Sequence, residues 1–163
     1  MPLRALLLKE LETEAATTRK VLARLPGDKL AWKPHEKSMS LGELAIHVAS
    51  NPGTIAKSSV PDSYPVENFQ PTPAPQSLAE ILAAHDTSVA EATSVLTRLS
   101  DDAAAAPWCM TAGGNPIVSM SRFEWIRTYV FNHWYHHRGQ LAVYLRQLNV
   151  PVPAIYGPSA DES

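Results

Sequence analysis

The chain has 163 residues, of which 45% are hydrophobic and 18% charged, and its formal net charge is -2 at pH 7. This length suits one domain, residues 1–163. The slightly acidic balance excludes a strong electrostatic grip on nucleic acid, and the lack of a long uncharged apolar stretch excludes a transmembrane helix. The single cysteine, Cys109, excludes an intramolecular disulfide and a cysteine-rich zinc site. We recognise no signal peptide and expect a cytoplasmic protein.

Prolines divide the chain into candidate helices and connections. Six of the 14 prolines fall between Pro52 and Pro75, whereas four long stretches contain none. Because proline breaks the interior of a helix, helices are expected in the proline-free stretches. These stretches are residues 3–25, 35–51, 76–106 and 117–150.

The first two stretches have the spacing of amphipathic helices. In residues 3–25, apolar side chains recur every three or four positions, and Pro26-Gly27 ends the pattern. In the second stretch, Ser40 and Glu43 have the spacing of a capping box, in which each side chain accepts a hydrogen bond from the other's backbone N–H. We expect a helix from Ser40 that Pro52-Gly53 kinks or ends.

The third and fourth stretches begin with the same capping pattern. Ser77 precedes Glu80 by three residues, and Ser121 precedes Glu124 by three. Each pair is followed by an apolar stripe of helical period, and prolines after residue 150 close the last helix.

The connections between these helices differ in composition. Residues 58–75 are rich in proline and lack periodicity, and Tyr64, Val66 and Phe69 can anchor them as an extended crossover. A short extended segment is possible within residues 101–116, but no parallel-sheet pattern is recognisable. The sequence therefore predicts an all-α fold, a four-helix bundle with a long proline-rich crossover between helices 2 and 3.

Two histidines of the last helix carry the main chemical signal. His133 and His137 are four residues apart, which places both imidazoles on one face, so that both can reach one metal ion. Zinc, nickel and iron accept imidazole nitrogen readily. A structural pair is the alternative, but two adjacent buried imidazoles without a shared partner would be costly.

A third ligand must come from another helix, and His47 is the best candidate. It lies about 100° from the centre of its helix's apolar stripe, so it either faces the neighbouring helix or is exposed. Glu43, one turn earlier, could orient its ring, as metal-bound histidines usually require. A surface Glu–His pair is the alternative interpretation.

The other histidines and nearby polar groups are less informative. His136 lies about 100° around the helix from His137; the pair His133/His136 is geometrically allowed, but His137 fits the stripe better. His85 lies on a core stripe and is interpreted as a hydrogen-bonded core residue or as a fourth ligand. His35 is expected to be exposed to solvent.

The remaining polar and aromatic groups allow more than one interpretation. Arg138 either binds an anionic substrate or pairs with an acid across the bundle. Cys109 is interpreted as a small buried residue. The aromatic residues of the last helix are interpreted as core or interface residues, or as the lining of a substrate pocket.

The stretch 132–146, Asn-His-Trp-Tyr-His-His-Arg-Gly-Gln-Leu-Ala-Val-Tyr-Leu-Arg, resembles the signature of the DinB-like proteins, the DinB/YfiT superfamily. The resemblance extends to Trp32-Lys33-Pro34, to residues 40–47 and to the C-terminal tail, residues 150–162. It implies a four-helix bundle that holds a divalent metal ion (zinc, nickel, iron or manganese) with three histidines. Carried over residue by residue, these ligands are His47, His133 and His137.

The resemblance also implies a class of activity. Some relatives are thiol-dependent enzymes that use a low-molecular-weight thiol such as bacillithiol or mycothiol, and members are often homodimers. We therefore expect a metal-dependent S-transferase that acts on a small-molecule substrate, as a homodimer, without nucleic acid or membrane partners. The alternatives are a hydrolase that uses metal-activated water and a non-catalytic metal-binding or stress-response protein. A fourth protein ligand such as His85 would favour the non-catalytic alternative.

Overall fold

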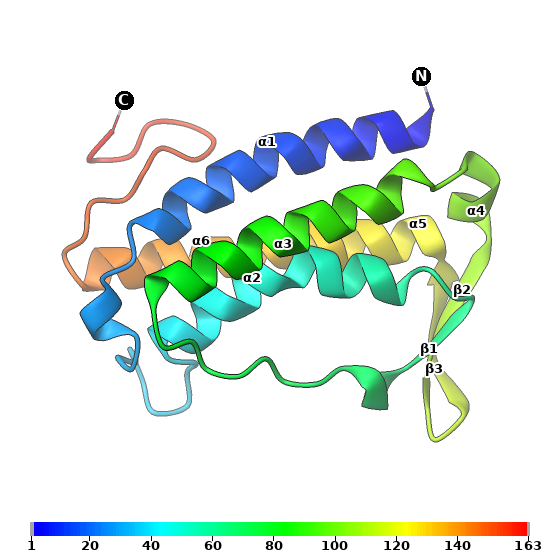
Figure 1. Cartoon of the computed structure of the whole chain (residues 1–163), viewed down its shortest axis with the longest axis horizontal. Coiled ribbons are helices and arrows are strands. Elements are labelled where there is room, and N and C mark those ends of the chain that lie inside the picture. Colours follow the sequence, from blue (N-terminus) through cyan, green and yellow to red (C-terminus); the bar gives the residue numbers. More distant parts are fainter. Residues whose placement is uncertain (1, 163) are drawn as a thin grey trace.

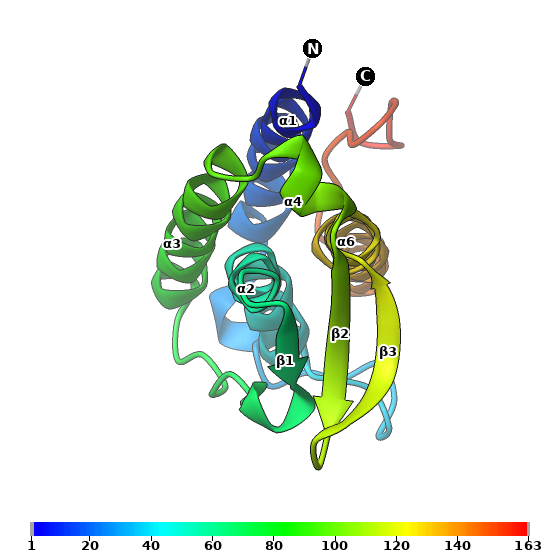
Figure 2. The same ribbon diagram turned by 90° about the vertical axis from the view of Figure 1, so that its right-hand side faces the viewer.

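The computed structural model describes residues 2–162, and helices form most of it (Figure 1). The long helices are α1 (Leu3–Ala23), α2 (Leu41–Ser58), α3 (Leu78–Thr97) and α6 (His133–Gln147), with two short helices, α4 (Asp101–Ala105) and α5 (Arg122–Trp125). A π-helical segment, Ile126–Asn132, joins α5 directly to α6. Seen along the helices in Figure 2, α1, α3, α2 and α6 surround one core. The four helices and their apolar stripes agree with the sequence prediction.

A small sheet at one end of the helices corrects the all-α prediction. It contains β1 (Ser63–Pro65), β2 (Pro107–Ala112) and β3 (Asn115–Ser121), in the order β1-β2-β3. β2 and β3 form an antiparallel hairpin, whereas β1 lies parallel to β2 (Figure 2). The hairpin turns at Gly113 and Gly114, whose φ angles of 53° and 82° favour glycine. β2 lies where a short extended segment was considered possible, whereas β1 has no recognisable pattern because it has only three residues and forms through pairing with a distant strand.

The helix starts show which capping predictions hold. Ser40 Oγ accepts from the Glu43 N–H at 3.1 Å, and the Glu43 carboxylate accepts from the Ser40 N–H at 2.6 Å. Ser121 and Glu124 form the same reciprocal box. At α3, Ser77 caps Glu80, but the Glu80 carboxylate accepts from the backbone of Gln76 instead.

Pro52 does not end α2, which continues to Ser58. Proline lacks the N–H that would bond to the carbonyl four residues earlier, and that carbonyl belongs to Val48. The indole Nε1–H of Trp134 in α6 donates to Val48 O at 2.9 Å and so satisfies it. The next N–H, that of Gly53, donates to Ser88 Oγ of α3 at 2.8 Å. Neighbouring helices thus supply the hydrogen bonds that the proline disrupts, which sequence periodicity alone does not reveal.

The crossover between α2 and α3 runs beside α2 and carries β1 and a short 3-10 turn, Val66–Asn68 (Figure 1). Tyr64 and Phe69 are partly buried, and their ring centroids lie 4.9 Å apart. The Glu67 carboxylate accepts from the Gly113 N–H at 2.8 Å, which ties the crossover to the hairpin. The crossover is therefore anchored as predicted, with an additional contact to the sheet.

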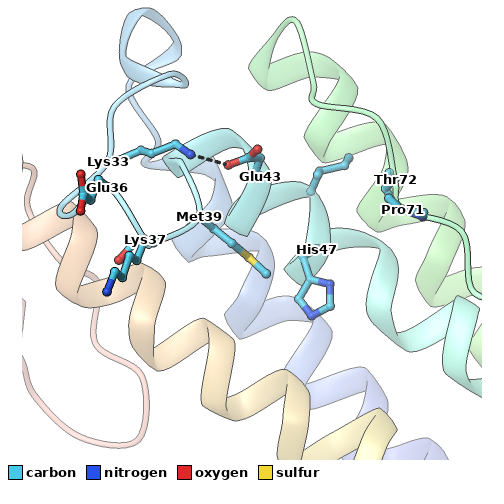
Figure 3. A pocket seen from close by; sticks show the side chains of 10 residues that line it. Lys33, Glu36, Lys37, Met39, Glu43, His47, Pro71 and Thr72 are labelled. Carbon is cyan, nitrogen blue, oxygen red and sulfur yellow. Dashed lines mark ion pairs between the residues drawn. The ribbon is translucent and has the colours of Figure 1, made fainter.

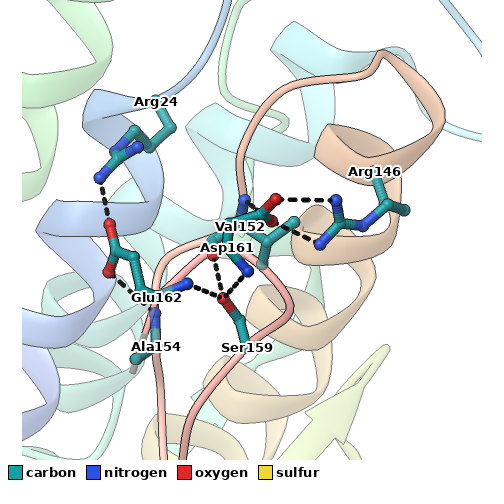
Figure 4. A network of polar contacts seen from close by, with 7 residues as sticks. All are labelled: Arg24, Arg146, Val152, Ala154, Ser159, Asp161 and Glu162. Atoms are coloured by element: carbon teal, nitrogen blue, oxygen red, sulfur yellow. Dashed lines mark hydrogen bonds and ion pairs between the residues drawn. The ribbon is translucent and has the colours of Figure 1, made fainter.

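The C-terminal tail folds back between the ends of α1 and α6 (Figure 4). Glu162 pairs with Arg24 of α1, and Asp161 pairs with Arg146 of α6. Ser159 Oγ donates to Val152 O at 2.7 Å and closes the loop. Among residues 2–162, no helix is both long enough and apolar enough to cross a membrane.

Candidate metal centre

Three histidines from two helices converge beside the bundle core. His47 lies on α2, and His133 and His137 lie one turn apart on α6. One ring nitrogen from each residue lies within 4.8 Å of those of the other two. The Nε2 atoms of His47 and His133 are 2.9 Å apart, and the His137 ring is 4.6 Å from the His47 ring, centroid to centroid. All three side chains are partly buried. The structure thus brings together the three residues that the resemblance selected, as a cluster that could hold a metal ion.

The contact between α2 and α6 is fixed immediately beside the cluster. Val48 follows His47 in the chain, and Trp134 follows His133, so the Trp134–Val48 hydrogen bond joins the neighbours of two cluster residues. Trp134 is fully buried. The bond that satisfies the α2 backbone at Pro52 therefore also sets the distance between His47 and His133.

The π segment ends at the first histidine of α6. The His133 N–H donates to Thr128 O, five residues earlier, instead of to Tyr129 O, four residues earlier. The side-chain amide of Asn51 on α2 donates to Tyr129 O at 3.1 Å and to Val130 O at 3.2 Å. Asn51 thereby satisfies the carbonyl that the wider turn releases. π segments inside α-helices often occur at functional sites.

The three imidazoles are neutral near pH 7. Burial, followed by repulsion from His137 and His133, lowers the pKa of His47 from 6.5 to about 4. Burial is also the main cause that lowers the pKa of His133 and of His137. His137 Nδ1 lies 2.7 Å from Gln140 Oε1, and because that oxygen only accepts, Nδ1 carries the proton. The lone pair of His137 Nε2 is then available to a cation.

Two cavities meet at His47. The first, which we call the charged cavity, has a volume of about 450 Å³ and is bordered by Lys33, Glu36, Lys37 and Glu43 (Figure 3). The second, which we call the aromatic cavity, has a volume of about 340 Å³ and includes Phe69, Trp125, Tyr129 and His133 in its lining. Pro71 and Thr72 of the crossover line both cavities. The histidine cluster can therefore be approached from two chemically different sides.

Comparison with known proteins identifies the family of the chain. A family model described as the DinB family matches residues 1–163. The chain belongs to the DinB family. The uncharacterized protein YrdA of Bacillus subtilis is 28% identical over 156 residues, which cover 95% of this chain and 89% of YrdA.

Solved structures of DinB-like proteins share the fold of this DinB-family chain. A DinB-like protein from Bacillus cereus superposes with a TM-score of 0.73 at 22% identity, over 91% of this chain and 95% of its own. The DinB-like protein YjoA from Bacillus subtilis gives a TM-score of 0.71 at 18% identity, over 93% and 98% of the two chains. At these identities the likeness shows the fold alone.

One expectation about a neighbour of the cluster is corrected. The Glu43 carboxylate does not orient the His47 ring; it accepts from the Ser40 N–H and faces Lys33 Nζ at 3.6 Å. The Glu43 carboxylate is therefore occupied by Lys33 and by the capping box.

His85 lies outside the cluster, buried in α3, with Nδ1 3.1 Å from the Asp86 carboxylate. Its place agrees with the interpretation as a core residue rather than a fourth ligand. His136 and His35 are exposed. Arg138 is 1% exposed and pairs with Glu14 of α1 at 2.6 Å, as the interpretation of an acid across the bundle expects.

The residues that support the cluster were not recognised from the sequence. Gln140 follows His137 by three residues, a spacing at which helical side chains meet, and this signal could have identified it. Asn51 and Trp134 act on backbone carbonyls exposed by a π turn and by Pro52, and neither feature has a signature in local sequence. The part of the prediction that allowed aromatic residues to line a pocket applies to Trp125, whereas Trp134 is a core residue.

Proposed function

We propose that this chain is a metal-dependent enzyme in which His47, His133 and His137 hold one divalent ion. The proposed reaction is a transfer of the S-transferase type between a low-molecular-weight thiol and a small-molecule substrate. The observation that supports the proposal most strongly is the convergence of three ring nitrogens within 4.8 Å between two cavities.

The donor set fits a divalent transition metal. Imidazole nitrogen binds zinc, nickel, iron and manganese, and neutral rings bind without first losing a proton. The Nε2 atoms of His47 and His133 point at one another across 2.9 Å, and Gln140 fixes the His137 ring so that its Nε2 is unprotonated. Three neutral donors leave the full positive charge of an ion uncompensated, so a bound ion would lower the pKa of a thiol or water molecule that it contacts.

An open coordination position favours catalysis over a purely structural ion. Structural zinc sites are usually closed by four protein ligands, whereas catalytic sites keep a position for substrate. Over residues 2–162, no other His, Cys, Asp or Glu joins the three histidines. The two cavities give a thiol and a second substrate separate approaches, and His47 borders both.

Metal content tests the site. We expect about one divalent ion per purified chain, measured by elemental analysis, and loss of most of it in His133→Ala and His137→Ala. His136→Ala is the matched control because this exposed ring lies on the same helix turn outside the cluster. Wild-type metal content in both cluster variants would contradict the assignment.

Activity tests the reaction. The metal-loaded protein is incubated with 1-chloro-2,4-dinitrobenzene and a panel of cellular thiols. The thiol sulfur replaces chloride on the ring, the thiol proton is released, and the thioether is followed by absorbance. We expect a metal-dependent rate with at least one thiol that disappears in His47→Ala and persists in His136→Ala. Hydrolysis of an ester without any thiol would favour metal-activated water instead, and no metal-dependent rate would favour the non-catalytic alternative. The homodimer stays a prediction, which the mass of the protein in solution tests.

A further inference from the structure

The aromatic cavity has a lining without charge. Its walls come from α2, the crossover, β2 and the helix that leads into α6. Among the described residues that line it, none is a Lys, Arg, Asp or Glu, in contrast to the charged cavity on the other side of His47. Away from the histidine cluster, transfer of a charged group into such a lining would leave the charge without a protein partner, so this part of the cavity selects against charged groups.

Aromatic rings follow one another along one wall of this cavity toward the histidine cluster. Trp125 and Tyr129 have ring centroids 4.1 Å apart, Tyr129 and His133 6.5 Å, and His133 and His137 4.4 Å. These residues are spaced by four, and in a regular α-helix each step of four overshoots a full turn by about 40°. The π segment has wider turns and reduces this drift over residues 126–132. It therefore helps keep Trp125 and Tyr129 on the face that carries His133.

A second wall of the cavity is provided by the crossover. Phe69 contributes a partly buried ring, which packs against Tyr64. The bond from the Gly113 N–H to the Glu67 carboxylate holds this part of the crossover against the hairpin. Asn51, which also lines the cavity, holds the π segment through two backbone carbonyls. Both aromatic walls are thus fixed by hydrogen bonds before any ligand binds.

We propose that the aromatic cavity binds an uncharged aromatic group of the substrate, with Tyr129 and Phe69 as the contact residues. The volume of about 340 Å³ lies at the small end of ligand sites, which suits one or two fused rings. A planar ring gains from stacking on aromatic side chains in addition to the area it buries. The orientation of such a substrate toward the reacting centre rests on the proposed function, because His133 and His47 line the same cavity.

Ring binding is tested with 2-naphthol, an uncharged aromatic probe, and with 2-decalol, its saturated counterpart. The full chain as purified is titrated with each compound, and the indole Nε1–H resonance of Trp125 is followed by NMR. This ring lies against Tyr129, with centroids 4.1 Å apart and planes at 37°, so a ligand against Tyr129 shifts its signal. We expect saturable shifts with 2-naphthol and binding of 2-decalol about tenfold weaker.

Two variants locate the binding site. Thr54 is an exposed residue of α2 that lines the cavity, and Thr54→Glu places an unpaired carboxylate there. We expect it to weaken 2-naphthol binding by about tenfold or more. Thr87→Glu, at an exposed position of α3 outside the lining, is the matched control and should bind like the wild type. Phe69→Ala should weaken binding about three- to tenfold through the lost ring contact.

The outcomes separate this inference from the proposed function. Unmoved Trp125 signals, equal affinity for 2-decalol, or equal binding by the two glutamate variants would each overturn the aromatic site. If 2-naphthol binds as expected while the metal-loaded protein transfers no thiol to any electrophile, the aromatic site stands and the S-transferase proposal fails. If the protein transfers thiol at the same rate with and without Thr54→Glu, the S-transferase proposal stands and the aromatic site fails.

Discussion

Two polar regions on α6 face different neighbouring helices and differ in how their polar groups are paired. Toward α2 lie His133 and His137, which are neutral rings. Their cluster contains three histidines and no carboxylate. Toward α1 lies Arg138, whose guanidinium pairs with Glu14 and donates to Thr18 Oγ1 at 3.1 Å and to the Tyr156 hydroxyl at 2.5 Å. The buried guanidinium of Arg138 is neutralised and hydrogen-bonded within the protein, whereas the histidine cluster offers nitrogen lone pairs that a ligand can use. The difference distinguishes a polar network that holds the fold from one that can accept a ligand.

Loss of Arg138 should have the largest effect on stability. Arg138→Met leaves the Glu14 carboxylate, in a residue that is only 8% exposed, without its ion-pair partner, which typically costs about 3–5 kcal/mol. Urea unfolding of the variant measures this loss. Arg146→Met is the matched control, because its ion pair with Asp161 lies at the surface, where solvent screens the two charges and the pair contributes little to stability. Equal losses in the two variants would contradict a structural role specific to Arg138.

Asn51 has both a structural and a ligand-side position. Its side chain donates hydrogen bonds to backbone carbonyls of the π segment, and it also lines the aromatic cavity. In Asn51→Leu the Tyr129 and Val130 carbonyls lose their donor, and we expect the free energy of unfolding to fall by about 1–3 kcal/mol. Metal affinity, measured by competition with a chelator, should also fall because His133 follows the π segment directly. Thr54→Ala, another substitution in the cavity lining, is expected to change neither quantity appreciably. Wild-type values in Asn51→Leu would show that the π segment holds without it.

A substitution of Gln140 tests the histidine cluster without disturbing the Arg138 network. Its Oε1 accepts from His137 Nδ1, and partners of this kind usually contribute about tenfold or more to metal affinity. We expect Gln140→Leu to weaken metal binding by about tenfold while stability in the absence of metal changes little, because Gln140 is exposed. Gln147→Leu, another exposed position on α6, serves as the control. An unchanged dissociation constant would mean that the His137 ring is oriented by packing alone.

The smallest expected effect concerns pH. Burial, then repulsion from His137 and His133, lowers the pKa of His47 to about 4 from 6.5, so between these values the unfolded chain binds a proton that the folded metal-free chain does not. The free energy of unfolding is therefore highest above pH 6.5 and falls as the pH is lowered toward 4. Because the ring is partly exposed, we expect His47 to contribute about 1 kcal/mol to this fall.

Unfolding in urea at a series of pH values, with a chelator present, measures the slope. His47→Gln should reduce it, whereas His35→Gln, at an exposed position, should leave it unchanged. An identical slope in His47→Gln would show that other groups cause the fall in stability.

Much of the helical framework follows from local signals. The stripes of α1 and α2 are buried as predicted, and the Ser40–Glu43 and Ser121–Glu124 boxes start their helices. The failures have a common cause, because they depend on distant partners. β1 exists through pairing with β2, and α2 passes Pro52 because Trp134 and Ser88 take over its hydrogen bonds.

The candidate site was predicted unevenly for the same reason. The spacing of His133 and His137 on one helix is a local signal that indicates a shared ligand. The side toward which His47 points depends on how α2 packs against α6, and helical periodicity placed it only at the flank of a stripe. The resemblance to a known family selected it, and the structure places it 2.9 Å from His133, Nε2 to Nε2.

The π segment has a consequence for how related chains can diverge. A π turn accommodates one extra residue within an otherwise continuous helix. Deletion of a single residue from 126–132 would restore regular α-helical turns, and the tighter winding would change the directions of side chains within the segment, Tyr129 among them, relative to His133 and His137. The histidine pair on α6 would keep its internal geometry, while the wall beside it would present different side chains. Insertions and deletions of one residue at this point are thus a route by which a bundle of this kind can change what it binds and still keep its histidine pair.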